Sequence, residues 1–168
     1  MVTEPDTKLI KKRIVEIIKD KMFDKTGENG GFLTIQKGLP DNNHFLSIEK
    51  PACFVANASD YENDKPLGPV TDVKGITHEG ASRHDFNFQI QIFEQGTDAE
   101  EVDDLLDDLH RKLKQTLKEN FRLVDPKTGE NPLVLQSLFT KTGNYSAEQD
   151  GKVVDGRIFL FTCLVISS

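Results

Sequence analysis

A strand pattern that runs directly into a helix pattern, at residues 84–113, restricts the fold of this chain more than any other stretch. Apolar and polar side chains alternate without interruption in FNFQIQI at residues 86–92. Strict alternation predicts a strand that buries one face and leaves the other in contact with water. A chain built around such a strand needs a second layer of structure to cover the buried face.

The residues that follow predict a capped amphipathic helix that can supply this layer. Thr97 and Glu100 have the spacing of a capping box, in which the Thr97 hydroxyl accepts a hydrogen bond from the Glu100 amide and the Glu100 side chain reaches back. Apolar residues then recur at helical spacing as far as about Phe121. They are Val102, Leu105, Leu106, Leu109, Leu113 and Leu117.

A second amphipathic helix is expected at residues 6–22, where isoleucines repeat at helical spacing. Further strands are expected at 32–36, 52–56, 133–139 and 157–166. The last of these, RIFLFTCLVI, is the most apolar run in the chain, which favours a central strand covered on both faces.

These elements predict an α+β fold in a single domain over residues 1–168. We expect an antiparallel or mixed sheet of about four strands, with the two amphipathic helices packed on one face. Extended loops are expected at about 24–44, 57–83 and 140–156, and they could form long arms like β-hairpins. Connections of this length in a compact domain are usually functional, ordered by a partner or disordered.

Composition narrows the classes of function. The net charge of −7 argues against a nucleic-acid-binding face, because phosphate contacts need clustered Lys and Arg. The two cysteines, Cys53 and Cys163, stand in apolar runs and are expected to be buried thiols in a reducing compartment. No segment approaches the roughly 18 apolar residues that cross a bilayer, so the protein is expected in a cytoplasm or in a particle assembled there.

The acidic run DDLLDDL at residues 103–109 is the strongest candidate for metal chemistry. Asp107 and His110 have the spacing of half a carboxylate–histidine metal motif, but the chain has no matching half on another helix. Helical spacing also pairs Asp107 with Arg111 and Asp108 with Lys112. We therefore expect a solvated helix face rather than a metal site.

Other candidate chemistry is sparse. His78 and His84 do not have a zinc-ligand spacing, and no cysteine lies near them. The chain has no G-x-S-x-G motif, and Gly30-Gly31 is not followed by the lysine of a phosphate-binding loop. We expect no catalytic, cofactor-binding or metal-ligating residues, and a protein that is not an enzyme.

The order of the segments resembles a known family of assembly proteins. KLIKKRIVEIIKDKM precedes KPACFVA, and after a long arm come FNFQIQIFEQGTDAEEVDDLLDDLHRKLKQTL and an apolar C-terminal strand. This organisation resembles the tail-terminator or tail-completion (neck) proteins of long-tailed bacteriophages and related contractile particles. The resemblance lies in the order of elements over most of the chain.

The resemblance implies a structural virion protein assembled in the cytoplasm of a bacterial host. In that family, a ring of six copies caps the tail tube, stops its polymerisation and joins it to the neck or head connector. The implied partners are other copies of the chain, the tail tube protein, and sheath and neck proteins. DNA would pass through the lumen without specific binding, and no membrane is involved.

Two alternatives stay open. The chain could be another neck or tail-completion component, or a ferredoxin-like ligand-binding or regulatory module. For such a module, His78, His84 and Asp85 would be the first residues to test.

Overall fold

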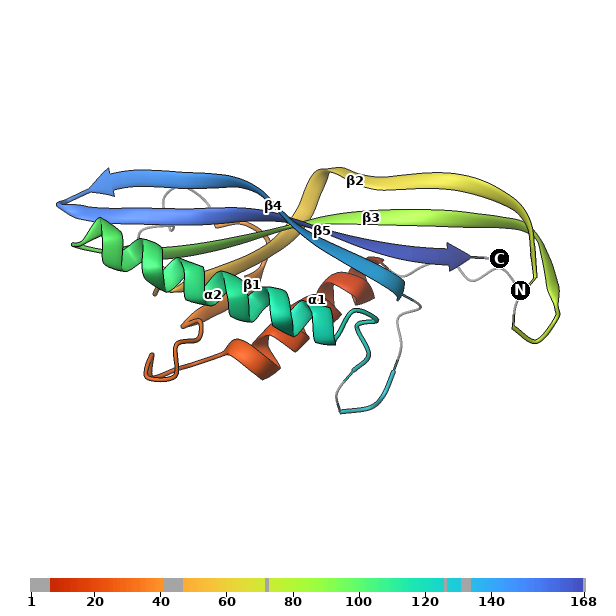
Figure 1. Cartoon of the computed structure of the whole chain (residues 1–168), viewed down its shortest axis with the longest axis horizontal. Coiled ribbons are helices and arrows are strands. Elements are labelled where there is room, and N and C mark those ends of the chain that lie inside the picture. Colours follow the sequence, from red (N-terminus) through yellow and green to blue (C-terminus); the bar gives the residue numbers. More distant parts are fainter. Residues whose placement is uncertain (1–6, 41–46, 72, 126, 131–133, 168) are drawn as a thin grey trace.

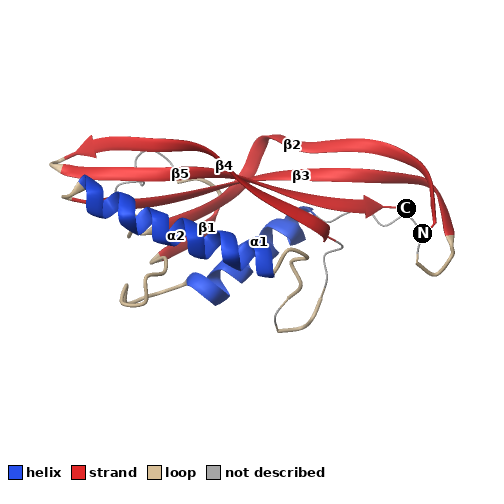
Figure 2. Cartoon of the chain, in the orientation of Figure 1, coloured by secondary structure: helices blue, strands red, loops and turns tan. Residues whose placement is uncertain are grey.

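The structure is a computed structural model that describes residues 7–40, 47–71, 73–125, 127–130 and 134–167 (Figure 1). These residues form two helices and five strands, coloured by type in Figure 2. In chain order these are α1 (Thr7–Met22), β1 (Thr34–Lys37), β2 (Ala52–Thr71), β3 (Thr77–Gly96), α2 (Ala99–Glu119), β4 (Val134–Gln149) and β5 (Lys152–Ser167).

The strands form one mixed sheet in the order β1-β2-β3-β5-β4. β1 runs parallel to β2, and the other neighbours are antiparallel. The prediction of an α+β fold is confirmed, although the part of the chain that the structure describes has five strands in its sheet where about four were expected. Two ranges that were expected as extended loops, 57–83 and 140–156, lie mainly in the paired strands of two long hairpins.

Both helices cover the same face of the sheet, as Figure 1 shows. Between helices and sheet lies one large apolar core, to which α1 contributes its isoleucines and β3 contributes Phe86, Phe88, Ile90 and Ile92. The predicted helices therefore form and bury most of the apolar residues that their spacing indicated. Leu105 of α2 is the exception, because it is 42% exposed. Among the described residues, no helix is long and apolar enough to cross a membrane.

The expectation that the C-terminal strand is covered on both faces is wrong. Along β5, buried residues such as Phe159, Phe161 and Cys163 alternate with half-buried ones such as Leu160 and Leu164. The reason is that both helices lie on one side, so the opposite side chains of β5 have no helical layer above them. Antiparallel sheets tolerate one partly solvated face.

The capping residue of α2 also differs from the prediction. The N-cap is Asp98, whose carboxylate accepts a hydrogen bond from the Glu100 amide at 3.0 Å. The helix begins at Ala99, one residue later than a Thr97 cap requires, and it ends at Glu119. Asp is as good an N-cap as Thr, and Glu100 and Glu101 then lie in the first turn, where the helix dipole favours negative charge.

A small apolar cluster on the opposite face of the sheet depends on one glycine. Gly156 in β5 lies between Phe93 in β3 and Tyr145 in β4, and these two rings meet edge to face at 5.7 Å. A Cβ at Gly156 would stand 2.5 Å from two ring carbons of Phe93. Only glycine leaves space for this ring to cross the strand.

Arg13 joins α1 to the loop that follows α2. Its guanidinium is almost fully buried and forms ion pairs with Glu16, Glu130 and Asp125. The Lys127 amide donates a hydrogen bond to the Asp125 carboxylate at 2.8 Å. This bond, together with the one from Arg13, holds the pKa of Asp125 at about 2, although desolvation by burial opposes the shift.

We expect acid to weaken the fold as pH falls from about 4 to about 2. The folded pKa of Asp125 lies below its ordinary value, so the unfolded chain binds more protons and stability rises with pH in this window. Urea unfolding near pH 5 and near pH 2.5 measures the loss. Asp125→Asn should make this loss smaller, whereas Asp104→Asn, at an exposed carboxyl on α2, should not. An equal loss in both variants would contradict the assignment to Asp125.

Candidate functional site

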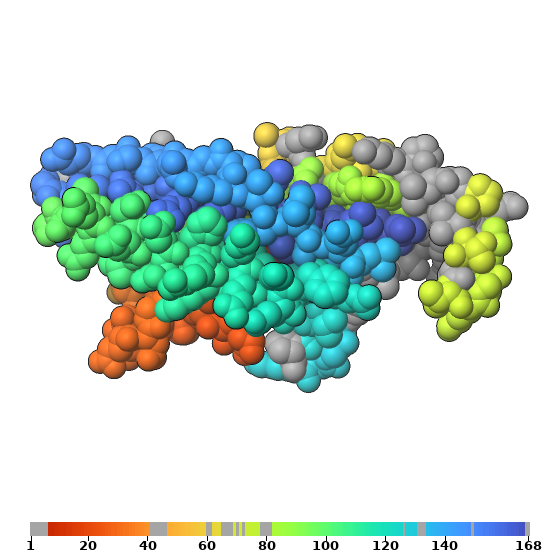
Figure 3. Space-filling model, viewed as in Figure 1, coloured from red at the N-terminus to blue at the C-terminus, as the bar shows by residue number. Residues whose placement is uncertain are grey.

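The most prominent surface feature is a long arm made by β2 and β3. Their pairing continues from Asn57↔Phe88 through three irregularities to Thr71↔Thr77. In Figure 1 this hairpin runs well past the ends of both helices and bends at its tip toward the side on which they lie. Figure 3 shows the yellow-green end of the arm standing clear of the helical layer. We define the arm as residues 62–86.

The tip of the arm carries apolar side chains in water. Val73 is fully exposed, and Ile76 is more than half exposed. Single exposed apolar residues are common on protein surfaces. Here, however, two exposed apolar residues lie within one turn at the end of a projecting hairpin. This arrangement indicates that the tip contacts another protein surface and is not left in solvent.

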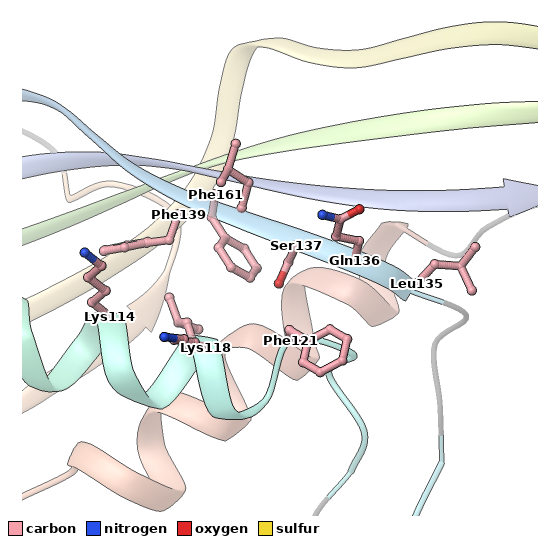
Figure 4. A pocket seen from close by; sticks show the side chains of 10 residues that line it. Lys114, Lys118, Phe121, Leu135, Gln136, Ser137, Phe139 and Phe161 are labelled. Carbon is pink, nitrogen blue, oxygen red and sulfur yellow. The ribbon is translucent and has the colours of Figure 1, made fainter.

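A second candidate surface is a groove of about 640 Å³ between α2 and β4. Leu117 and Phe161 contribute to its buried floor, while Phe121, Leu135 and Leu138 are exposed within it. Figure 4 shows Lys114 and Lys118 on the helix side and the residues of β4 opposite them. The groove is thus concave, mainly apolar and bordered by two cations, the usual properties of a surface that binds a partner or a ligand.

The acidic run on α2 is engaged in a long-range ion pair. Arg157 of β5, which is buried, donates to Asp103 at 3.0 Å and also pairs with Asp107. The predicted pair of Asp107 with Arg111 is therefore wrong, because Arg157 takes its place. Residue spacing along a helix cannot reveal a cation that arrives from a strand.

The other predicted pair on this helix is also wrong. Asp108 pairs with Arg111 at 2.9 Å, three residues on rather than four. Lys112 instead donates to the backbone carbonyls of Asn29 and Gly30, at 3.4 and 3.2 Å. Both aspartates and Arg111 remain exposed, so the helix face is solvated, as expected.

His110 does not join Asp107 in a ligand set. Its ring packs on Phe159 with the centroids 4.7 Å apart and lies near Phe139 at 6.1 Å. Burial, with further contributions from nearby cations of which Arg157 is the largest, lowers the pKa of His110. A histidine in this setting is a neutral packing residue between helix and sheet.

His84 and Asp85, two of the three residues proposed as first test residues, do not converge. His84 and Asp85 are adjacent in β3, so they point to opposite faces. Asp85 pairs with Arg83 at 2.9 Å, whereas Nδ1 of His84 lies 2.6 Å from Asp64 Oδ1 on β2. The backbone of His78 pairs with Val70, and its side chain lies outside the described residues.

Glu62 and Asp64 are the acidic neighbours of His84 that sequence reasoning missed. They stand about twenty residues from His84 in the chain, and no motif links them to it. Their juxtaposition results from the register of the arm, in which Asp64 lies directly opposite His84. Only the pairing of β2 with β3 could have identified them.

Both cysteines are buried in the sheet and are not bonded to each other. Burial raises the pKa of each thiol far above its ordinary value. A thiol that resists ionisation in an apolar core is a poor nucleophile and a poor metal ligand.

No family model matches the chain, and no curated protein matches it.

Proposed function

We propose that this chain is a structural assembly protein of the virion, a tail terminator that forms a ring of six copies. The observation that carries the proposal is the arm, which extends past the helical layer and ends in two exposed apolar residues. Among the described residues, β3 pairs with β5 only from Ser82 onward, so the arm beyond this residue consists of β2 and β3 alone. An isolated two-stranded hairpin is marginally stable in water. A neighbouring copy that covers the arm supplies the burial that the single chain lacks.

The position of the candidate surfaces favours a ring over a closed dimer. The arm lies at one end of the molecule, while the groove borders β4, an edge strand of the described sheet. If the arm of one copy contacts the groove of the next copy, two different surfaces meet, and the contact is head to tail. Head-to-tail contacts build rings when the rotation between copies closes, whereas a two-fold dimer would use one surface twice.

In this role the ring caps the tail tube, stops its polymerisation and joins it to the neck or head connector. Its partners are the tail tube protein and, in a contractile particle, sheath and neck proteins. The chain is assembled in the bacterial cytoplasm and carries no catalytic function. Its net charge of −7 suits a lumen through which DNA slides, since cations clustered there would hold phosphates.

Native mass spectrometry of the purified protein, with negative-stain images of the same sample, tests this proposal. We expect six copies per particle and a ring with a central opening. If the chain is a monomer alone, purified tail tubes are added, and rings should then appear at tube ends. A stable dimer, or tubes without caps, would overturn the terminator assignment.

A ligand-binding module is the second candidate, and the groove between α2 and β4 is the observation that favours it. Two lysines beside an apolar floor would suit an anionic amphipathic ligand. Binding would raise the thermal unfolding temperature of the wild-type chain with ligand concentration. Lys114→Ala with Lys118→Ala should reduce that shift, whereas Lys152→Ala, outside the groove, should not.

A further inference from the structure

We propose that Glu62, Asp64 and His84 form a binding site for a divalent transition-metal ion, with Zn²⁺ as the reference ion, on the arm. One ligand atom from each residue lies within 4.8 Å of the other two. The proposal stands independently of the terminator function, because it rests only on the arm of a single chain.

The backbone of the arm brings the three side chains to one face. Regular pairing from Asn57 onward would set Tyr61 opposite His84, but the irregularity that follows Asn57 sets Asp64 there instead. Glu62 lies two residues before Asp64 and therefore on the same face. In Figure 1, β2 bends sharply near its middle before it continues along the arm. Strand irregularities of this kind often re-aim side chains at functional positions.

The histidine of the cluster is held in a fixed orientation. The ring of His84 stacks on Phe86 with centroids 5.9 Å apart and planes 5° from parallel, and Phe86 belongs to the buried core. The His84 side chain is only 13% exposed, whereas Asp64 is 51% exposed. A packed imidazole beside two exposed carboxylates lets the carboxylates adjust around an ion while the ring stays in place.

The separations fit coordination after small side-chain rotations. Ligands about 2.0–2.2 Å from Zn²⁺ in a tetrahedral arrangement lie roughly 3.3–3.5 Å from one another. The His84 Nδ1 to Asp64 Oδ1 distance of 2.6 Å would widen slightly, and Glu62 would move inward. Both carboxylates are exposed, so there is space in solvent for their side chains to change rotamer.

The donor set selects the class of ion. Imidazole nitrogen favours zinc and its neighbours in the transition series over Mg²⁺ and Ca²⁺, which prefer oxygen ligands alone. Three protein ligands leave at least one coordination position open for water or for a group from another molecule. The acidic run on α2 is a poorer site, because Arg157 already neutralises Asp103 and Asp107.

A bound ion would clamp β2 to β3 where their pairing resumes after the irregularity. Glu62 and Asp64 belong to one strand and His84 to the other, so an ion held by all three is a crosslink at the base of the arm. Because the ion binds only the folded hairpin, it stabilises the arm by mass action.

Isothermal titration of the full chain with ZnCl₂ in a buffer that does not chelate metals tests the site. We expect one Zn²⁺ per chain and much weaker binding of MgCl₂ at the same concentration. His84→Ala and Glu62→Gln should each weaken Zn²⁺ binding about tenfold or more. Glu62 is exposed, so its variant keeps the test valid if His84→Ala impairs folding.

Two matched variants test whether Zn²⁺ binds specifically at this site or at any acidic part of the surface. Asp85→Asn removes the neighbouring carboxylate on the opposite face of β3, and Asp104→Asn removes one from the acidic run on α2. Both should bind Zn²⁺ like the wild-type chain. The proposal is overturned if the wild-type chain takes up no Zn²⁺, or if Glu62→Gln and His84→Ala bind it as tightly as the wild type does.

Discussion

A chain in which Asn-Gly replaces residues 66–82 is expected to fold and to form no rings. Lys65 and Arg83 are paired across the arm, so a two-residue turn joins them without a change of register. The replacement removes the tip with Val73 and Ile76 but leaves the sheet beneath the helices intact. Native mass spectrometry of the intact and shortened chains, measured side by side, checks the result.

The shortened chain carries its own control for folding. It retains Glu62, Asp64 and His84, so it should bind Zn²⁺ as the intact chain does if the metal site exists. Circular dichroism and thermal unfolding report on the core independently of any ion. Rings of unchanged stoichiometry from the shortened chain would show that the arm does not hold neighbouring copies together. If the shortened chain forms no rings but still binds Zn²⁺, it is folded, and the deletion impairs only the assembly of copies.

Phe88→Ala is expected to lower the free energy of unfolding by about 3–5 kcal/mol. Phe88 has no exposed surface and lies in β3, the middle strand of the sheet, opposite Phe161 of β5. Its removal leaves a cavity between the sheet and the helices, since neighbouring side chains collapse only in part. Domains are typically stable by about 5–15 kcal/mol, so the variant should lose much of its stability. Urea unfolding at pH 7 measures the change.

Phe121→Ala provides the matched control for this measurement. The same side chain is removed, but Phe121 is 43% exposed and follows the last turn of α2. Phe121→Ala should lower the free energy of unfolding clearly less than Phe88→Ala does, because much of the Phe121 ring already contacts water in the folded state. Equal losses from the two variants would mean that Phe88 is not the central packing residue that the core geometry indicates.

The prediction of the helices and of β3 succeeded because their signals are local. Periodic apolar residues in α1 and α2, and strict alternation in β3, require one buried face whatever lies opposite. The cap of α2 was misplaced by one residue because Thr97 and Asp98 are both good caps and only the start of the helix decides between them. Strand lengths were underestimated because the hairpin ends are polar and resemble loops.

The candidate sites depended on contacts that no local pattern encodes. Arg157 reaches Asp103 only because β5 pairs beside β3 and faces the helices. Asp64 meets His84 only because an irregularity shifts the register of β2. Both contacts join residues far apart in the chain, where spacing carries no information about distance.

By itself, the sequence determined the α+β class, the two amphipathic helices and the alternating central strand. Each of these follows from side-chain periodicity within one segment, because helix and strand repeat with different periods. The tertiary structure alone decided the strand order, the parallel pairing of β1, the extent of the arm and the partners of the acidic residues. Those features depend on which strands become neighbours and in what register. The core determines that choice, because only one arrangement packs the apolar faces of the helices and of the sheet against each other.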